Sequence, residues 1–492
     1  MALSFGAPLK TLRTADRVEA MLFWGVLVLL VWAPIPLGSN RAWAWTLLEV
    51  WTFALAAAWL VAWAWGWVET PEVVRRAWMA WVVLALWMAL QAMYIVPMPA
   101  SWVASLSPEA ARMQAFVAEI GIQRTSMTLS VEPHASRESL LKSLAYCAVF
   151  FLVVALTNRR SRVLMLARVI VYAAVVQAIY AILMHLGGVV QPFFGNVLNH
   201  ADSASGTYVN RNHFAGLLEM SLSVGIGLLI AGLSDRSADT WKRFVQNTIE
   251  WILSPKMFLR LSLCILVIAL TTTHSRMGNT GFFAALLITG AVGIVLSRHA
   301  TRNTVILLVS LVAIDLFIVG SWFGVEKLAK RIEQTTMEDV REREDPAAYS
   351  MDLIKAYPVF GAGPGTFYVA FPPYRQEKVV AFYDVAHNDY AQLASETGLI
   401  GFALMGSFVV MSLGAALLAQ WRRRDPLMRG MSFACIMGTT AILIHSWVDF
   451  NLQIPANAVL FMVILGLGWI SLFLERREGA GPPRTRDSSE SP

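Results

Sequence analysis

The chain has little charge. Only 15% of its 492 residues are Asp, Glu, Lys or Arg, while 57% are hydrophobic. A soluble globular domain carries about 25% charged residues, so the composition excludes that class. The 19 tryptophans fit the alternative, because indole rings favour the boundary between membrane and water. The composition therefore predicts an integral membrane protein.

Cysteine is also scarce, and recognisable metal motifs are missing. Cys147, Cys264 and Cys435 each lie in an apolar run without CxxC spacing, which is typical of small core residues rather than of disulfides or metal ligands. The chain has no HExxH motif and no DxD pair, and the acidic run EDVREREDP is typical of a solvated helix face. We therefore expect no metal site and no cofactor.

The net charge of +6 does not indicate a nucleic-acid partner in a chain of this class. Basic residues of membrane proteins gather in cytoplasmic loops, and we expect the excess there. At the start of the chain, Lys10, Arg13 and Arg17 precede an apolar run that no small-residue cleavage site follows. This run is predicted to be a retained first helix rather than a signal peptide.

Long apolar runs are frequent. A helix needs about 20 apolar residues to cross a bilayer, and the chain has runs for about twelve such helices. The prediction is therefore an all-α integral membrane protein with about twelve transmembrane helices. The runs lie near 17–36, 42–68, 77–96, 137–157, 163–186, 213–233, 257–273, 277–297, 303–323, 398–419, 430–447 and 455–474.

The connections between these runs alternate in charge. One set is rich in Lys and Arg, whereas the short connections of the other set hold almost only Arg41, Arg211 and Arg276. Under the positive-inside rule the basic set is cytoplasmic. This places both termini in the cytoplasm and the three arginines on the outer face.

Two connections on the predicted outer face are long. Residues 97–136 contain SPEAARMQAFVAEIGI, a candidate amphipathic helix at the membrane surface. Residues 324–387 are predicted to form a long helical loop, in which a helix should stop before Pro358 and enter a glycine-rich turn. The predicted parts are 1–136, with the first helices and first loop; 137–475, the main transmembrane domain; and 476–492, a tail of disordered composition.

Polar residues gather beside four of the apolar runs, all on the predicted outer face. The four stretches are TYVNRNHFAG around Arg211, TTTHSRMGN around Arg276, AHNDYAQLASETGLIG around His387 and HSWVDFNLQIP around Asp449. They come from connections that are far apart in the sequence. Because ionisable groups at a membrane edge generally face a bundle interior or a polar cavity, we expect one shared site.

Each stretch has a simpler explanation when it is taken alone. Arg211 or Arg276 could extend its charge to the interface, and the asparagines of VNRN could cap the next helix. His387 could be a helix-start residue, His274 is more typical of a structural residue, and Asp449 could pair with a neighbouring helix. The occurrence of all four stretches on one face favours a functional site.

Two arginines and a histidine suit transfer from a diphosphate. The guanidinium group is permanently charged and binds phosphate oxygens in pairs. The negative charge that develops on a departing diphosphate needs fixed cations nearby. A histidine, whose ordinary pKa is about 6.5, can accept a proton from a sugar hydroxyl. Without a metal motif, a metal-free mechanism is favoured.

The same stretches resemble the O-antigen ligase and polymerase superfamily. The matching pieces are GTYVNRNHFAG, THSRMGNTGF, the spacing from Arg343 to Pro358 followed by GAGPGTF, AHNDYAQLASETGLIG and HSWVDFNLQIPANA. The resemblance implies a metal-independent, inverting glycosyltransferase whose donor is a glycan on undecaprenyl diphosphate. It implies a location in the bacterial inner membrane, with the lipid bilayer as a partner and the active site facing the periplasm.

The resemblance also implies residue roles. Arg211 and Arg276 would hold the diphosphate, and His387 would activate the acceptor hydroxyl, so these three are the predicted catalytic residues. The predicted substrate-binding residues are Arg343, Ser275, Asn212, Asn388, Asp389, His445 and Asp449. Asn388 and Asp389 are also expected to cap the following helix or to orient the ring of His387. The GLIG end of the motif is expected to permit close helix packing.

The acceptor stays open between two reactions. Chain length and the HSWVDFNLQIPANA ending favour polymerization of exopolysaccharide or O-antigen repeat units, in which the acceptor is another glycan. The alternative is a ligase that delivers the glycan to lipid A core. A transporter or flippase for a lipid-linked sugar or small anion is a different class, with Glu219 and Asp315 as relay candidates. A structural subunit of an export complex is a third.

Overall fold

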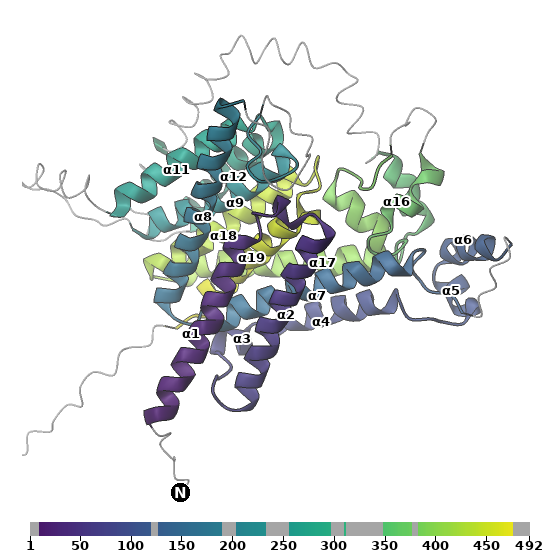
Figure 1. Cartoon of the computed structure of the whole chain (residues 1–492), viewed down its shortest axis with the longest axis horizontal. Helices are drawn as coiled ribbons and strands as arrows, with labels where there is room; N and C mark the ends of the chain where they lie inside the picture. The colour runs from purple at the N-terminus through teal and green to yellow at the C-terminus, as the bar shows by residue number, and fades with distance from the viewer. Residues whose placement is uncertain are drawn as a thin grey trace, which may run out of the picture.

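The computed structural model describes residues 9–119, 126–188, 203–232, 255–296, 309–310, 348–375 and 382–475. Within these ranges every regular element is a helix, and the extended pairing is limited to an isolated bridge between Met98 and Met127. The elements form a bundle of long helices, with short helices at one end (Figure 1). The prediction of an all-α protein is confirmed for this part of the chain.

The long helices follow the apolar runs of the sequence. In chain order they are α1 (Leu9–Trp32), α2 (Ala42–Ala64), α4 (Trp78–Met93), α7 (Pro133–Leu156), α8 (Arg160–Leu186), α9 (Arg211–Ala231), α11 (Pro255–Thr272), α12 (Arg276–Leu296), α17 (Asp389–Arg422), α18 (Pro426–His445) and α19 (Pro455–Phe473). The short elements are α3 (Glu72–Arg76), α5 (Ala100–Leu106), α6 (Pro108–Glu119), α16 (Phe367–Ala370) and the 3-10 turns η1 (Leu37–Ser39), η2 (Pro372–Tyr374) and η3 (Asn451–Gln453).

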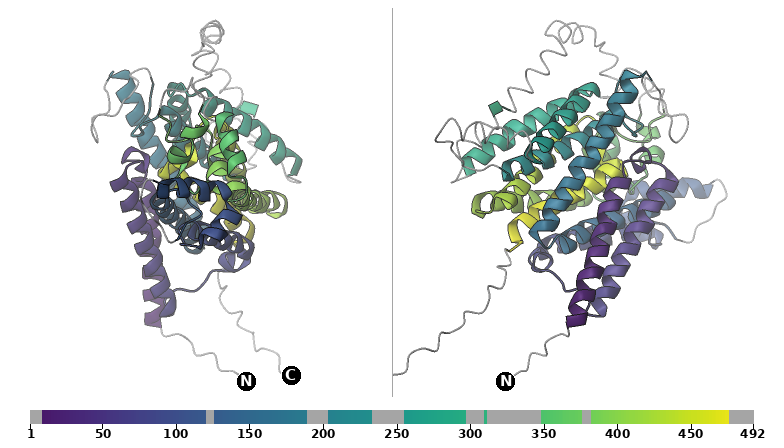
Figure 2. Two further views of the ribbon diagram at one scale, coloured as in Figure 1. Left: turned by 90° about the vertical axis from the view of Figure 1, so that its right-hand side faces the viewer. Right: turned by 60° about the vertical axis from the view of Figure 1, so that its left-hand side comes forward.

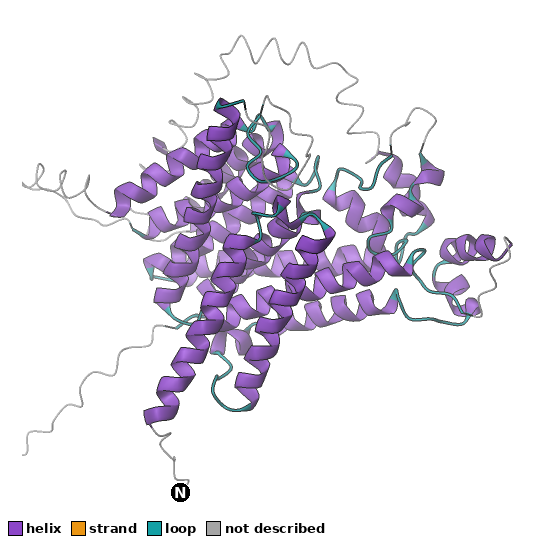
Figure 3. Cartoon of the chain, viewed as in Figure 1, coloured by secondary structure: helices purple, strands orange, loops and turns teal. Residues whose placement is uncertain are grey.

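Several long helices begin at a proline. Pro133, Pro426 and Pro455 occupy the first turns of α7, α18 and α19. Proline suits this position because its fixed φ matches the helix and its missing N–H group would have no partner there. Figure 3 shows the described segments between the helices as loops and turns.

Eight of the described helices are long and apolar enough to cross a membrane: α2, α7, α8, α9, α12, α17, α18 and α19. The helix α4 and the stretch Met257–Thr272 of α11 are apolar but shorter. The predicted span 303–323 lies outside the described residues apart from 309–310. A multi-pass membrane protein is therefore confirmed, while the total of twelve spans and the orientation stay predictions.

The centre of the bundle is formed by α9, α18 and α19. In α9 and α19, 89% of the most apolar stretch is buried inside the protein, whereas in α2 and α17 the value is 28%. A helix that is apolar on all sides belongs in an interior, and an apolar face left exposed suits lipid. Figures 1 and 2 show α1 and α2 as neighbours on one flank of this central group.

The helix α17 is broken near its start. Gly398 has φ +62° and ψ −168°, a conformation available essentially to glycine alone, so residues 389–397 form a half-helix separate from 399–422. The segment 358–367, GAGPGTF with its preceding residues, lies across the break. Its Ala362 N–H donates to Ser395 O at 2.9 Å, and Leu399 N–H donates back to Pro358 O at 2.9 Å. The broken helix therefore regains its lost backbone hydrogen bonds from this segment.

The glycines of both partners are required by this contact. A Cβ atom on Gly361 would lie 2.3 Å from the Glu396 carbonyl carbon, and one on Gly398 would lie 2.3 Å from Val359 O. The helix before Pro358 ends as expected, because helical residues run from 348 to 356. The GLIG glycine Gly398 serves the approach of the 358–367 segment rather than helix-on-helix packing.

Candidate functional site

Three helices start at the polar stretches of the sequence, and each start has a capping side chain. Asn210 Oδ1 accepts a hydrogen bond from Asn212 N at 2.8 Å, and Ser275 Oγ accepts one from Gly278 N at 3.2 Å. Asn388 Oδ1 accepts from Tyr390 N at 2.9 Å and from Ala391 N. Such caps fix where the helix begins. Arg211 and Arg276 are consequently the first residues of α9 and α12.

The connection between α18 and α19, residues 446–454, receives the start of α17. Ser446 Oγ donates to Asp389 Oδ2 at 2.7 Å, and Leu452 N donates to the same oxygen at 3.1 Å. The Asn388 amide donates to Trp447 O at 2.7 Å. The polar triplet His387–Asn388–Asp389 is therefore bonded to the fourth polar stretch, which lies about 60 residues away in sequence.

The same connection also receives the start of α9. Asn212 Nδ2 donates to Asp449 Oδ2 at 2.6 Å, and His213 Nε2 lies 3.4 Å from Asp449 Oδ1. Burial alone would raise the pKa of Asp449. The close approach of His213, with the nearby His445 and the Phe450 N–H group, outweighs burial, so the pKa of Asp449 lies below its usual range. Asp449 is thus an ionised anchor between α9 and the connection.

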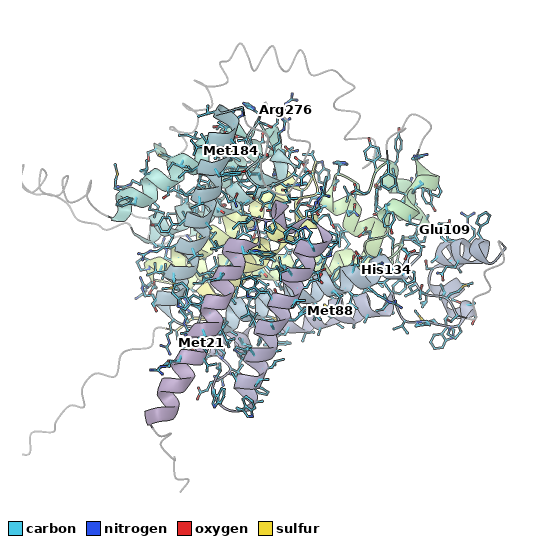
Figure 4. The ribbon with its side chains drawn as sticks, in the orientation of Figure 1. Met21, Met88, Glu109, His134, Met184 and Arg276 are labelled. Atoms are coloured by element: carbon cyan, nitrogen blue, oxygen red, sulfur yellow. The ribbon has the colours of Figure 1, made fainter. Side chains whose placement is uncertain are left out.

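The start of α12, the third helix, packs against a buried pair formed by α18 and α9. His445 Nδ1 lies 2.8 Å from Glu219 Oε1, which links α18 to α9. Two glycines of α12 lie against this pair. A Cβ atom on Gly278 would be 3.3 Å from His445 Cε1, and one on Gly281 would be 3.2 Å from Glu219 Oε2. Arg276, two residues before Gly278, therefore lies at the same end of the bundle, where Figure 4 shows it.

The ring of His387 lies among aromatic side chains. Its centroid is 4.9 Å from that of Phe450, in an edge-on arrangement, and 5.9 Å from that of Tyr383. The ring of His213 lies 4.5 Å from Phe450 as well. His387 has φ +51°, a left-handed conformation that histidine adopts more often than most residues but at some cost. Strained backbone of this kind concentrates at functional sites.

Residues 261–406 match a protein-family model described as O-antigen ligase. This part of the chain is similar to the O-antigen ligase family. The match begins in α11 and ends in α17, so it includes Arg276, the 358–367 segment and the His387 triplet. No curated protein matches the chain at a significant level.

The match confirms the resemblance to the O-antigen ligase-related superfamily. It indicates a membrane glycosyltransferase-like enzyme of polysaccharide or lipopolysaccharide assembly, with lipid-linked glycans as the class of substrate. Arg211 and the 446–454 connection lie outside the matched residues. The connection bonds to Asp389, within the match, through Ser446 and Leu452.

The sequence-predicted residues fall into two groups by exposure. Arg276 is exposed, and Arg211, His387 and Asn388 are half-buried. The second group is buried, and each member bonds to other protein groups: Ser275, Asn212, Asp389, His445 and Asp449. Arg343 and the relay candidate Asp315 lie outside the described residues. Hydrogen bonds join Asn212, Asn388 and Asp389 to the connection of residues 446–454, which contains Asp449.

Several contributors to the site were missed from the sequence. Phe450 and Ser446 carry no recognisable signal, because an aromatic residue or a serine at a helix end is common. Glu219 did carry one, since an acid within an apolar run is costly and has a reason to be there. The sequence suggests Glu219 only as a transporter relay candidate, whereas in the structure it is buried and paired with His445.

Proposed function

We propose that the protein is a metal-independent, inverting glycosyltransferase that moves a glycan from undecaprenyl diphosphate to an acceptor hydroxyl. The observation that carries the proposal is the packing of the N-termini of α9, α12 and α17 against residues 445–454. Asn212 of α9 bonds to Asp449, and Asp389 of α17 bonds to Ser446. Gly278 of α12 lies close to His445. Two of these helices begin with Arg211 and Arg276, and the third is preceded by His387. Helix N-termini carry partial positive charge and favour anions such as phosphate.

In the proposed reaction, the two arginines bind the diphosphate of the donor. His387 accepts the proton of the acceptor hydroxyl as the acceptor oxygen forms its bond to the anomeric carbon. The bond between that carbon and the diphosphate oxygen breaks, and the diphosphate leaves with the electron pair. Its added negative charge is stabilised by the fixed guanidinium groups. Attack from the side opposite the leaving group inverts the anomeric centre.

The buried polar residues have a supporting role in this proposal. Asp449, Asp389 and Ser446 hold the helix starts in register, and the pair of His445 with Glu219 holds α9 to α18 beneath α12. Catalytic groups act at full rate only when their geometry is fixed. A residue of this kind contributes by orienting the groups that touch substrate.

The preferred acceptor is another glycan, so the reaction is polymerization of exopolysaccharide or O-antigen units at the periplasmic face of the bacterial inner membrane. Transfer to lipid A core is the alternative. Purified protein would be incubated with lipid-linked repeat units, with and without lipid A core. Longer lipid-linked chains support the polymerase, and a glycan-modified core supports the ligase instead. No transfer to either acceptor contradicts the proposed function.

A further inference from the structure

Two residues of the AHNDYAQLASETGLIG stretch have no part in the reaction described above. Gln392 and Glu396 lie one turn apart on the 389–397 half-helix, so their side chains share a face. Both are buried, with exposed fractions of 2% and 7%. A buried amide and a buried carboxyl group are costly unless their polar atoms are bonded. Their bonding partners therefore indicate why they are present.

The two side chains form a continuous chain of hydrogen bonds. Ala386 N donates to Gln392 Oε1 at 2.6 Å, and Gln392 Nε2 donates to Glu396 Oε1 at 2.7 Å. Phe367 N donates to the same Glu396 oxygen at 3.3 Å. The chain runs from the end of the glycine-rich 358–367 segment to the residue immediately before His387.

The direction of each bond is dictated by chemistry. A backbone N–H group can only donate, so the Gln392 oxygen must face Ala386. The Gln392 amide nitrogen then faces Glu396, which must accept from it and from the Phe367 N–H group. A glutamine is the side chain that accepts at one atom and donates at the next. Replacing either member by an apolar residue leaves a buried N–H group without its partner.

This chain fixes one neighbour of His387, and a second set of bonds fixes the other. Ala386 is held by Gln392, and Asn388 is held by its cap and by Trp447 O. His387, between them, has φ +51°. A strained conformation persists only where its surroundings determine it from both sides. The position of the ring is thus set by its anchored neighbours Ala386 and Asn388, which bond to the 389–397 half-helix and to Trp447 O.

We propose that Gln392 and Glu396 are positioning residues, which hold His387 for proton transfer and tie its position to the 358–367 segment. The proposal rests on the proposed function, in which His387 is the general base. Neither residue touches substrate. Loss of either lets the backbone around His387 relax, and a relaxed base is misplaced with respect to the acceptor hydroxyl.

The first experiment measures steady-state transfer of lipid-linked repeat units. Gln392→Leu and Glu396→Leu are expected to lower kcat about tenfold to a hundredfold, with KM for the lipid-linked donor nearly unchanged. Glu396→Gln keeps an oxygen acceptor at the same place and should restore most of kcat. Thr397→Val removes a side-chain bond to Leu393 O on the same half-helix and serves as the matched control with wild-type kcat.

The second experiment does not depend on activity. Hydrogen–deuterium exchange of the 382–390 peptide reports the Ala386 N–H group, which is buried and bonded in the wild type. Exchange of this peptide should rise in Gln392→Leu and Glu396→Leu, while the peptides of α9 and α18 keep their protection. If a leucine variant unfolds, Gln392→Asn or Glu396→Asp takes its place in both experiments. These substitutions shorten the side chain by one carbon and keep its polar group.

The outcomes separate the proposals. Local exchange with a fall in kcat supports the positioning role. Local exchange with unchanged kcat, an effect on KM alone, or a wild-type Ala386 N–H group that exchanges rapidly would overturn it. A wild-type protein that transfers no glycan speaks against the proposed function, while the exchange measurement still reports whether Gln392 and Glu396 hold the backbone.

Discussion

The Nδ1 atom of His445 lies 2.8 Å from the Oε1 atom of Glu219, and both side chains are fully buried between α9 and α18. Breaking such a pair strands one polar partner in the interior. We expect Glu219→Leu to destabilise the folded protein by about 3–5 kcal/mol. Thermal unfolding in detergent would measure this as a lower Tm.

The double variant Glu219→Leu, His445→Leu is the control for this pair. Replacing both partners by apolar residues leaves nothing unpaired, so its Tm should lie above that of the single variant. Equal losses in the single and double variants would show that the pair contributes only through packing volume.

The three residues assigned to the reaction should each be essential for transfer. His387→Ala removes the base and should lower the rate about a hundredfold to ten-thousandfold. Arg276→Ala and Arg211→Ala should lower it about a hundredfold or more, because fixed cations stabilise the leaving diphosphate. Arg168→Ala, at an exposed position on α8, is the matched control and should keep wild-type activity. The measurement is product formation from lipid-linked repeat units, with membrane insertion checked alongside.

Wild-type turnover in His387→Ala or Arg276→Ala would refute the assigned mechanism. A loss that appears only together with lower Tm would instead point to a structural contribution of the same residue.

Chelation of divalent ions should have little effect on transfer. The proposed mechanism stabilises the diphosphate with Arg211 and Arg276 rather than with a metal. Activity would be measured before and after dialysis against EDTA, and again after Mg²⁺ or Mn²⁺ is added back. Strict dependence on the added ion would contradict the metal-independent mechanism.

The glycines at the helix break should not tolerate a side chain. A Cβ atom on Gly361 or Gly398 would lie 2.3 Å from backbone atoms, and both glycines have positive φ. Gly361→Ala and Gly398→Ala should each cost at least about 1–3 kcal/mol from backbone strain alone, seen as a lower Tm. Gly406→Ala in the same helix α17 meets no atom within 4 Å and is the control. A Tm equal to that of the control would disprove the tight contact of 358–367 with α17.

The pKa of Asp449 lies below its usual range, so its contribution to stability depends on pH in one direction. The unfolded pKa is about 3.9. The stabilisation is complete above that value and is lost as pH falls from there through the lower folded pKa. The Tm difference between wild type and Asp449→Asn should therefore be constant from about pH 5 to 8 and shrink in stronger acid. A difference that changes near neutral pH would mean that another group dominates.

The positions of the helices could be read from the sequence because lipid imposes a local requirement. A helix that crosses a bilayer must be apolar along its own length, and eleven of the twelve predicted runs coincide with a described helix. The capping role of Asn388 was likewise local, since an asparagine before a helix bonds to N–H groups two and three residues ahead.

The sequence could not predict which of the polar residues are accessible to substrate and which are buried and bonded to protein groups. His445 and Asp449 were expected to bind substrate, yet both are buried and bonded to protein groups from distant segments. The pattern HSWVDFNLQIP gives no indication that its Phe450 contacts two histidines. Such contacts join residues more than 60 positions apart, which only the packing of the helices brings together.

By itself, the sequence determined the class of the protein, the helices and the four polar stretches, because hydropathy, caps and charge act within a few residues along the chain. Only the tertiary structure decided which polar groups are exposed or half-buried and which are buried and bonded to other protein groups. It also decided that the 358–367 segment repairs the break in α17 and that Gln392 and Glu396 link this segment to His387. The physical reason is that a buried polar group must find a partner, and that partner is chosen by three-dimensional packing rather than by distance along the chain.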